Sequence, residues 1–230
     1  MKVRVAFTPG EEVAAPLGVV IDVLRATSTI CQAFAAGYEQ IVCVGEVVEA
    51  RALAGPGVAL AGERGNVRPE GFDFGNSPRE FADCAGAGTL VLTTTNGTRL
   101  LLAAAARCDA VLVASLLNLD AVLETVRARG ADEVAILCAG VEGAFAVDDA
   151  YVAGVLADEL GGDPDDAAAA AIRLARTFAT DEQGIGGGVS AENIRRVGLD
   201  DDIAWCARRS ALGVVPRVVE RTPSTIALQS

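Results

Sequence analysis

A stretch that joins an apolar run to acidic, basic and hydroxyl side chains is the part of this chain best suited to chemistry. Asp22 directly follows the apolar residues 19–21, Arg25 comes three residues later, and Thr27, Ser28 and Thr29 come next. Residues 30–36 have a helical pattern, so the hydroxyls are expected at a helix N-terminus, where free N–H groups and the helix dipole attract anions. The sequence predicts a phosphate or sulfonate site here. An N-capped helix with an Asp–Arg pair at the surface is the alternative interpretation.

A second turn of similar design follows another apolar run at residues 90–93. Its asparagine–glycine pair permits positive φ, and the segment offers hydroxyl and amide groups without a charge. An ordinary capped β-turn is the simpler explanation. Under the anion-binding hypothesis, the substrate contacts from this turn and from a later strand end are Thr94, Thr95, Asn96, Gly97, Thr98 and Asn118.

Carboxylates near predicted strand ends suggest a divalent cation. Asp22 cannot serve an anion directly, but it can hold a cation that bridges to one. The chain contains no histidine, so a metal would be held by oxygen atoms, which favours Mg²⁺ or Mn²⁺. We expect Asp22, Glu63 and one of Asp148 or Asp149 around Mg²⁺. The alternative for the last two is a favourable interaction with the N-terminus of their own helix.

Arginine side chains supply the positive charge that such a site needs. Arg25 and Arg64 are expected to bind anionic oxygens and to stabilise developing charge, because a guanidinium group presents a planar fork of donors. Pairing with the excess of surface carboxylates is the alternative. We assign Asp22, Arg25 and Arg64 as the catalytic residues.

Composition excludes several functional classes. The net charge of −12 argues against nucleic acid as a partner, and the absence of histidine excludes Ser-His-Asp hydrolases and histidine-ligated metal sites. The chain has neither an uncharged apolar run of membrane-spanning length nor a secretion signal, so we expect a cytoplasmic protein without membrane contact. Its cysteines are scattered and form no C-x-x-C pair.

The pattern of short apolar runs alternating with alanine-rich segments predicts one domain of 230 residues. The expected fold class is α/β, a three-layer α/β/α arrangement with a largely parallel sheet whose edges could be mixed. In such a sheet the polar loops after the strands meet at one edge, where ligands bind. Gly184 to Gly188 are expected to form a mobile flap. Strands are predicted at residues 3–7, 18–21, 41–44, 58–61, 90–93, 110–114, 134–137 and 214–219, and helices at 29–36, 47–54, 78–84, 98–106, 119–129, 148–160, 165–178, 191–197 and 202–207.

Because several of these motifs occur in the same order along the chain, the sequence resembles the 2-phosphosulfolactate phosphatase family, which acts in coenzyme M biosynthesis. The resemblance implies a Mg²⁺-dependent phosphatase that removes phosphate from a three-carbon acid carrying a sulfonate. The roles given above to individual residues are our own hypothesis and are not carried over from the family. The segments that carry the resemblance are residues 21–29, 62–65, 71–78, 93–98 and 138–140.

Other functions remain open at this point. A non-catalytic binding module for a phosphorylated or sulfonated metabolite is the alternative, although several acidic side chains disfavour anion binding unless a metal is present. A kinase is disfavoured because no Walker A motif exists. For hydrolysis, water is expected to attack phosphorus, with an Asp22 aspartyl-phosphate as the second possibility. A homodimer is the usual expectation for a soluble enzyme.

Overall fold

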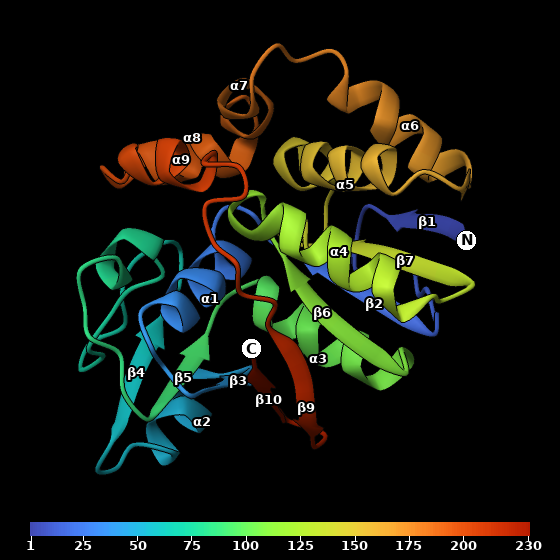
Figure 1. Cartoon of the computed structure of the whole chain (residues 1–230). Coiled ribbons are helices and arrows are strands. Elements are labelled where there is room, and N and C mark those ends of the chain that lie inside the picture. Colours follow the sequence, from blue (N-terminus) through green and yellow to red (C-terminus); the bar gives the residue numbers. More distant parts are fainter.

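Short, β-branched runs form the strands of a ten-stranded sheet in the computed structural model, which describes residues 1–230 (Figure 1). Their order across the sheet is β4-β5-β3-β10-β9-β6-β2-β7-β1-β8. The strands are β1 Lys2–Ala6, β2 Leu17–Ile21, β3 Gln40–Val44, β4 Val58–Gly62, β5 Thr89–Thr93, β6 Ala110–Ala114, β7 Glu133–Cys138, β8 Asp163–Pro164, β9 Arg217–Arg221 and β10 Thr225–Gln229.

The sheet consists of two parallel blocks joined by an antiparallel hairpin. Strands β6, β2, β7, β1 and β8 are parallel to one another, as are β3, β5 and β4. Between the blocks, β9 pairs antiparallel with β10, β10 with β3, and β9 with β6 through the single pair Leu112 and Arg217. The two blocks therefore run in opposite directions along the sheet. The expectation that all strands run parallel to one common edge was wrong, although the loops after β2, β4, β5 and β7 still meet at one place.

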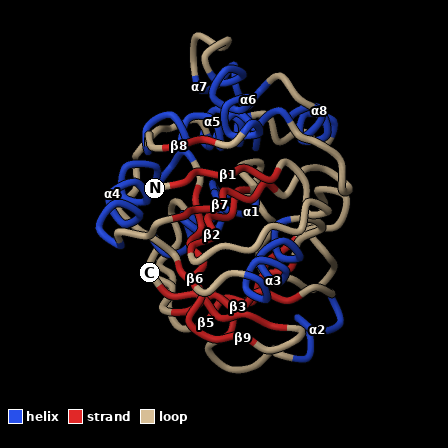
Figure 2. The backbone as a smooth tube through the Cα atoms, turned by 90° about the vertical axis from the view of Figure 1, so that its right-hand side faces the viewer, coloured by secondary structure: helices blue, strands red, loops and turns tan.

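Helices cover both faces of the sheet, which confirms the three-layer α/β/α class. On one face, α4, α5 and α6 pack on the apolar side chains of β1, β2 and β7, and on the other face α1 and α3 pack (Figures 1 and 2). Alternate residues of β2 point into the two layers, as Val19 and Val20 show. The helices are α1 Ala26–Ala35, α2 Val47–Ala52, α3 Gly97–Arg107, α4 Leu119–Arg129, α5 Val147–Leu160, α6 Asp166–Ala175, α7 Asp181–Gly186, α8 Val189–Arg196 and α9 Asp201–Cys206.

The main differences from the sequence-based elements lie at the end of the chain and at short segments. β8 and β10 were not predicted, because β8 has only two residues and β10 is a short run near the C-terminus. Residues 184–186 of the expected glycine flap belong to α7, which Thr180 caps by accepting the N–H of Gln183. Residues 78–81 form a 3₁₀ turn in place of the longer helix that was expected.

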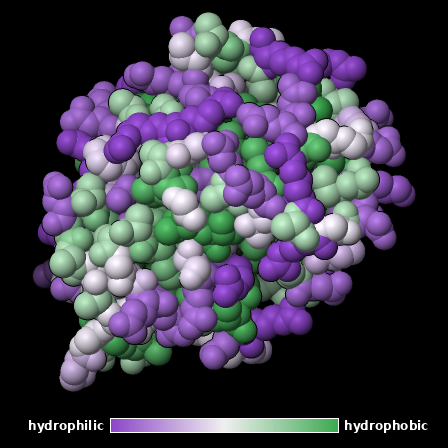
Figure 3. Space-filling view, in the orientation of Figure 1, coloured by the Kyte–Doolittle hydropathy of each residue, from purple (hydrophilic) through white to green (hydrophobic).

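The surface mixes hydrophilic and hydrophobic side chains (Figure 3). Polar side chains are spread over the face seen in Figure 3, with apolar ones between them. Among the helices, we find none with the length and apolar character needed to cross a bilayer.

Candidate active site

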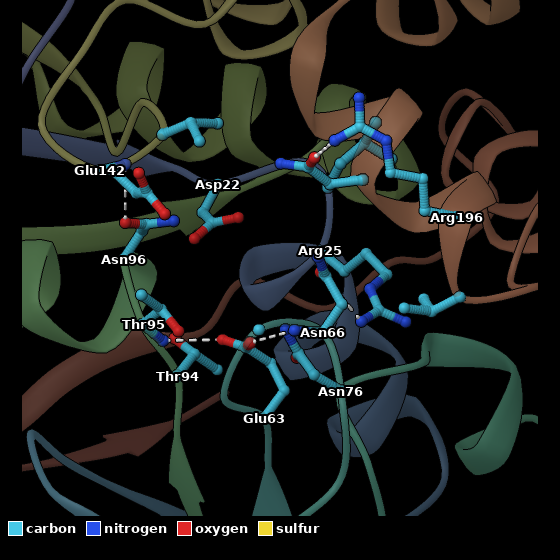
Figure 4. A pocket seen from close by; sticks show the side chains of 15 residues that line it. Asp22, Arg25, Glu63, Asn66, Asn76, Thr94, Thr95, Asn96, Glu142 and Arg196 are labelled. Carbon is cyan, nitrogen blue, oxygen red and sulfur yellow. Dashed lines mark hydrogen bonds between the residues drawn. The ribbon is translucent and has the colours of Figure 1, made fainter.

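A polar cavity of about 340 Å³ lies where loops from the two blocks of the sheet meet (Figure 4). The loops after β2 and β7 come from one block, those after β4 and β5 come from the other, and α8 adds one wall. The carboxyl ends of the two blocks thus converge although their strands run in opposite directions. The lining residues are Asp22, Leu24, Arg25, Glu63, Gly65, Asn66, Asn76, Thr94, Thr95, Asn96, Val141, Glu142, Asn193, Arg196 and Val197.

Asp22 lies at the end of β2, against the first turn of α1. One carboxylate oxygen accepts the N–H of Ala26 at 3.3 Å, while Oδ2 lies so close to Gly97 that a Cβ there would approach it to 2.5 Å. Burial raises the pKa of Asp22 to about 7, and the charges of Asp148 and Glu63 add to this effect. A cation beside Asp22 would remove this penalty, since it favours the charged carboxylate.

Glu63 follows β4 and connects two loops of the cavity. Its Oε1 accepts the N–H of Thr95 at 2.7 Å, and its Oε2 accepts the N–H of Asn66 at 2.8 Å. Asn66 has a φ of 65°, a left-handed conformation that asparagine tolerates well. These contacts hold the turn after β5 and the turn after β4 at fixed positions on either side of the Glu63 carboxylate.

Arg25 is a buried member of the cavity wall and is already paired with a carboxylate. Its Nη1 donates to Oδ2 of Asp202 at 2.7 Å, and Oδ1 of Asp202 accepts the hydroxyl of Ser77 at 2.6 Å. The side chains of Arg25 and Asp202 are only 1% and 0% exposed. Nε of Arg25 has no partner, and Nη2 has only a 3.5 Å contact with Asn66. Sequence reasoning missed Asp202, because nothing local connects residues 177 positions apart.

Three further polar residues of the cavity were not predicted as site residues from the sequence. Glu142 has a φ of 52° and donates its N–H to Oδ1 of Asn96 at 3.3 Å. Asn193 and Arg196 come from α8 and share a hydrogen bond of 3.0 Å. The amphipathic pattern of α8 identified a helix, but it contained no signal that one end of this helix reaches the cavity.

The hydroxyl groups of α1 do not form the expected anion site. The helix begins at Ala26, earlier than predicted, and the hydroxyls of Thr27, Ser28 and Thr29 donate to the carbonyl oxygens of Asp22, Val23 and Asn76. All three side chains are buried and none lines the cavity. They fix the loop that carries Asp22 and Arg25, which is a structural role.

Several other predicted contacts are also directed into the protein. Arg64 donates to the carbonyls of Glu63 and Gly45 and to the hydroxyl of Thr93, so its guanidinium group lies outside the cavity lining. The amide of Asn118 is used by backbone groups of its own loop and of residue 214. Thr98 caps the turn by bonding to Thr94. Of the predicted substrate contacts, the cavity lining contains Thr94, Thr95 and Asn96.

Asp148 and Asp149 lie behind the cavity wall. Asp149 accepts the N–H groups of Val23 and Gly140, both at 2.9 Å, and so joins the loops after β2 and β7. Asp148 accepts the hydroxyl of Ser190 at 2.8 Å. No group of three or more acidic, histidine or cysteine side chains is arranged to hold a metal ion. The expected cluster that adds Asp148 or Asp149 to the pair of Asp22 and Glu63 is therefore not formed.

The remaining oxygen atoms of the cavity still fit Mg²⁺. Asp22 and Glu63 both line it, and Oδ1 of Asn76 and Oγ1 of Thr95 are buried oxygens without a hydrogen-bond partner. Mg²⁺ is commonly held through one or two carboxylates, with water and substrate phosphate as its other ligands. The donor set is therefore sufficient without Asp148 or Asp149.

Comparison with known proteins identifies the family of this chain. The family profile described as 2-phosphosulpholactate phosphatase matches residues 4–221. A probable 2-phosphosulfolactate phosphatase of Thermus thermophilus is 40% identical over 222 residues, covering 94% of each chain. The 2-phosphosulfolactate phosphatase of Methanothermobacter thermautotrophicus is 36% identical over 216 residues, covering 94% of this chain and 92% of its own. This chain belongs to the 2-phosphosulfolactate phosphatase family.

Proposed function

We propose that this protein is a Mg²⁺-dependent phosphatase that hydrolyses 2-phosphosulfolactate to 3-sulfolactate and phosphate, the reaction associated with coenzyme M biosynthesis. The names of its relatives support the substrate. Support for the metal comes from the charges of the cavity, which are the observation that carries this proposal.

The cavity by itself repels a highly charged anion. Its lining includes the carboxylates of Asp22, Glu63 and Glu142 and the guanidinium groups of Arg25 and Arg196. The charge of Arg25 is already compensated by a buried ion pair. A substrate that carries phosphate, carboxylate and sulfonate groups therefore requires an added cation, because like charges at short distance disfavour binding.

The cavity residues have different proposed roles. Asp22 and Glu63 would hold Mg²⁺, which when bound neutralises phosphate oxygens and orients the nucleophile. Thr94, Thr95 and Asn96 place hydroxyl and amide groups beside the carboxylates, where they would bind and orient the phosphate. Arg25 lines the cavity and its Nε has no partner, so although Asp202 balances its charge, this N–H would donate a hydrogen bond to a phosphate oxygen.

Release of phosphate from 2-phosphosulfolactate tests the proposal. We expect activity with Mg²⁺, loss of activity in EDTA and recovery when Mg²⁺ is restored. Asp22→Asn and Glu63→Gln should each lower kcat/KM by at least ~100-fold, because they remove proposed ligands. Glu124→Gln is the matched control, since Glu124 is an exposed residue of α4. Equal activity in EDTA and in Mg²⁺ would refute the metal dependence.

The nucleophile can be identified by a single turnover in ¹⁸O-water. We expect the label in the released phosphate and none in the protein, since water is the proposed nucleophile. Label in the carboxylate of Asp22 would establish an aspartyl-phosphate intermediate instead.

A further inference from the structure

One guanidinium group of the cavity is not committed to a buried carboxylate. The side chain of Arg196 is 70% exposed, and its polar contacts are Oδ1 of Asn193 at 3.0 Å and the exposed carboxylate of Glu192 at 3.5 Å. An exposed pair at this distance contributes little and is easily exchanged for another anion. Arg25, in contrast, is fully buried against Asp202. Arg196 is therefore the cationic side chain of the cavity that is most available to a ligand.

Arg196 also lies at a distinct end of the cavity. Figure 4 shows it on the α8 side, opposite Thr95 and Asn96, with Asp22 between the two ends. If phosphate binds near Asp22, Glu63 and the turn after β5, the part of the substrate farthest from phosphorus extends toward α8. In 2-phosphosulfolactate that part is the sulfonate, which is carried on a separate methylene group.

We propose that Arg196 determines specificity by binding the sulfonate of the substrate, with Asn193 holding the guanidinium group in place. This inference rests on the proposed function and assigns a role to a residue that takes no part in phosphate chemistry. The planar fork of a guanidinium group suits a group with several equivalent anionic oxygens. Arg196 thereby distinguishes a sulfonated substrate from one that ends in a methyl group.

The test compares kcat and KM for 2-phosphosulfolactate, 2-phospholactate and p-nitrophenyl phosphate. The second compound lacks the sulfonate, and the third lacks both acid groups. Arg196→Ala should raise KM for 2-phosphosulfolactate by ~10- to 100-fold, the usual effect of losing a charge-assisted hydrogen bond, with kcat nearly unchanged. Neither parameter should change for the other two substrates. Arg196→Lys should retain part of the preference, because it keeps the charge.

Arg195→Ala is the matched control. Arg195 is the neighbouring residue on α8, is exposed, and donates to the carbonyl of Gly186 instead of lining the cavity. Its removal changes the net charge equally, so it reports any long-range effect of charge. We expect it to leave all three substrates unaffected.

The possible failures are distinguishable. A wild-type protein that releases no phosphate from any of the three compounds refutes the proposed function and this inference with it. An active wild type in which Arg196→Ala leaves 2-phosphosulfolactate unaffected, or impairs all three substrates equally, refutes only the inference. Equal losses for 2-phosphosulfolactate and 2-phospholactate would show that Arg196 binds the carboxylate and would overturn the assignment to the sulfonate.

Discussion

Replacing Asp202 with asparagine isolates the contribution of a buried charge to this fold. Asp202 lies on α9, and its carboxylate contacts Arg25 at 2.7 Å and Ser77 at 2.6 Å. Asparagine has nearly the same shape and can keep one of these contacts. The change therefore removes the negative charge and leaves the Arg25 guanidinium group, 1% exposed, without a compensating carboxylate.

The expected loss of stability is large. Breaking a buried ion pair by removing one partner costs about 3–5 kcal/mol, because the other charge stays out of water. We expect the lower end of this range for Asp202→Asn, since the amide oxygen still accepts a hydrogen bond. For a chain of this size, about 3 kcal/mol corresponds to a decrease in Tm of roughly 6–12 °C.

The adjacent residue provides the control. Asp201 pairs with Arg79 at 2.9 Å, but its side chain is 76% exposed, so Asp201→Asn should change the free energy of unfolding by at most about 1 kcal/mol. Thermal and urea unfolding of both variants measure the difference. The double variant Arg25→Gln with Asp202→Asn should recover part of the loss, because neither buried charge remains. If Asp202→Asn is no less stable than Asp201→Asn, the reasoning from burial is wrong.

Three further results are expected. Gly97→Ala should lower phosphate release at least ~10-fold by displacing Asp22, since the added Cβ would approach Oδ2 to 2.5 Å. Gly213→Ala is the control and should be neutral, because a Cβ there meets nothing within 4 Å. Equal activities of the two variants would refute the predicted steric clash with Asp22. Asp149→Asn should lower the Tm, because Asp149 joins two loops through backbone N–H groups. It should leave the Mg²⁺ affinity of the folded protein unchanged, because Asp149 does not line the cavity; weakened Mg²⁺ binding in calorimetry would show that it is a ligand. Burial raises the pKa of Asp22 from 3.8 to about 7, so its stabilising contribution in EDTA is present below pH ~4 and is lost as the pH rises through about 7. In urea titrations, Asp22→Asn should therefore gain stability relative to wild type over that interval, and a constant difference would contradict the shifted pKa.

Local patterns were sufficient to predict most of the strands and helices. Strands such as β2 and β7 are short and, apart from Glu133 at the start of β7, apolar, and a buried parallel strand is the structure in which such a run is stable. α4 was predicted with its observed bounds, because its amphipathic run ends at Gly130 in the left-handed conformation. The opposite directions of the two blocks could not be predicted in this way. They depend on the antiparallel insertion of β9 and β10, whose pairing partners are far away in the sequence.

The candidate site was predictable to the extent that its side chains follow strands directly. Asp22, Glu63 and the turn at Thr94 were identified because each comes immediately after an apolar run. Arg196 and Asp202 were missed because they come from helices near the end of the chain. Only the packing of α8 and α9 against the loops brings Arg196 to the cavity and Asp202 to the guanidinium group of Arg25. Sequence spacing contains no information on such contacts.

The choice among the carboxylates shows what decides between a ligand and a structural residue. Asp22 follows a strand and Asp149 lies in the first turn of a helix, and burial raises the pKa of both, so residue type and burial do not separate them. Their hydrogen bonds distinguish the two carboxylates. Asp149 uses both oxygens to hold N–H groups of two loops. Asp22 accepts the single N–H of Ala26, and its Oδ2, packed close to Gly97, has no hydrogen-bond donor. Position relative to the cavity matters as well. Glu63 also accepts N–H groups of two loops, but it lines the cavity together with Asp22, whereas Asp149 does not. A carboxylate that lines a polar cavity can meet a cation there, and one behind the wall can do so only if the loops it joins come apart.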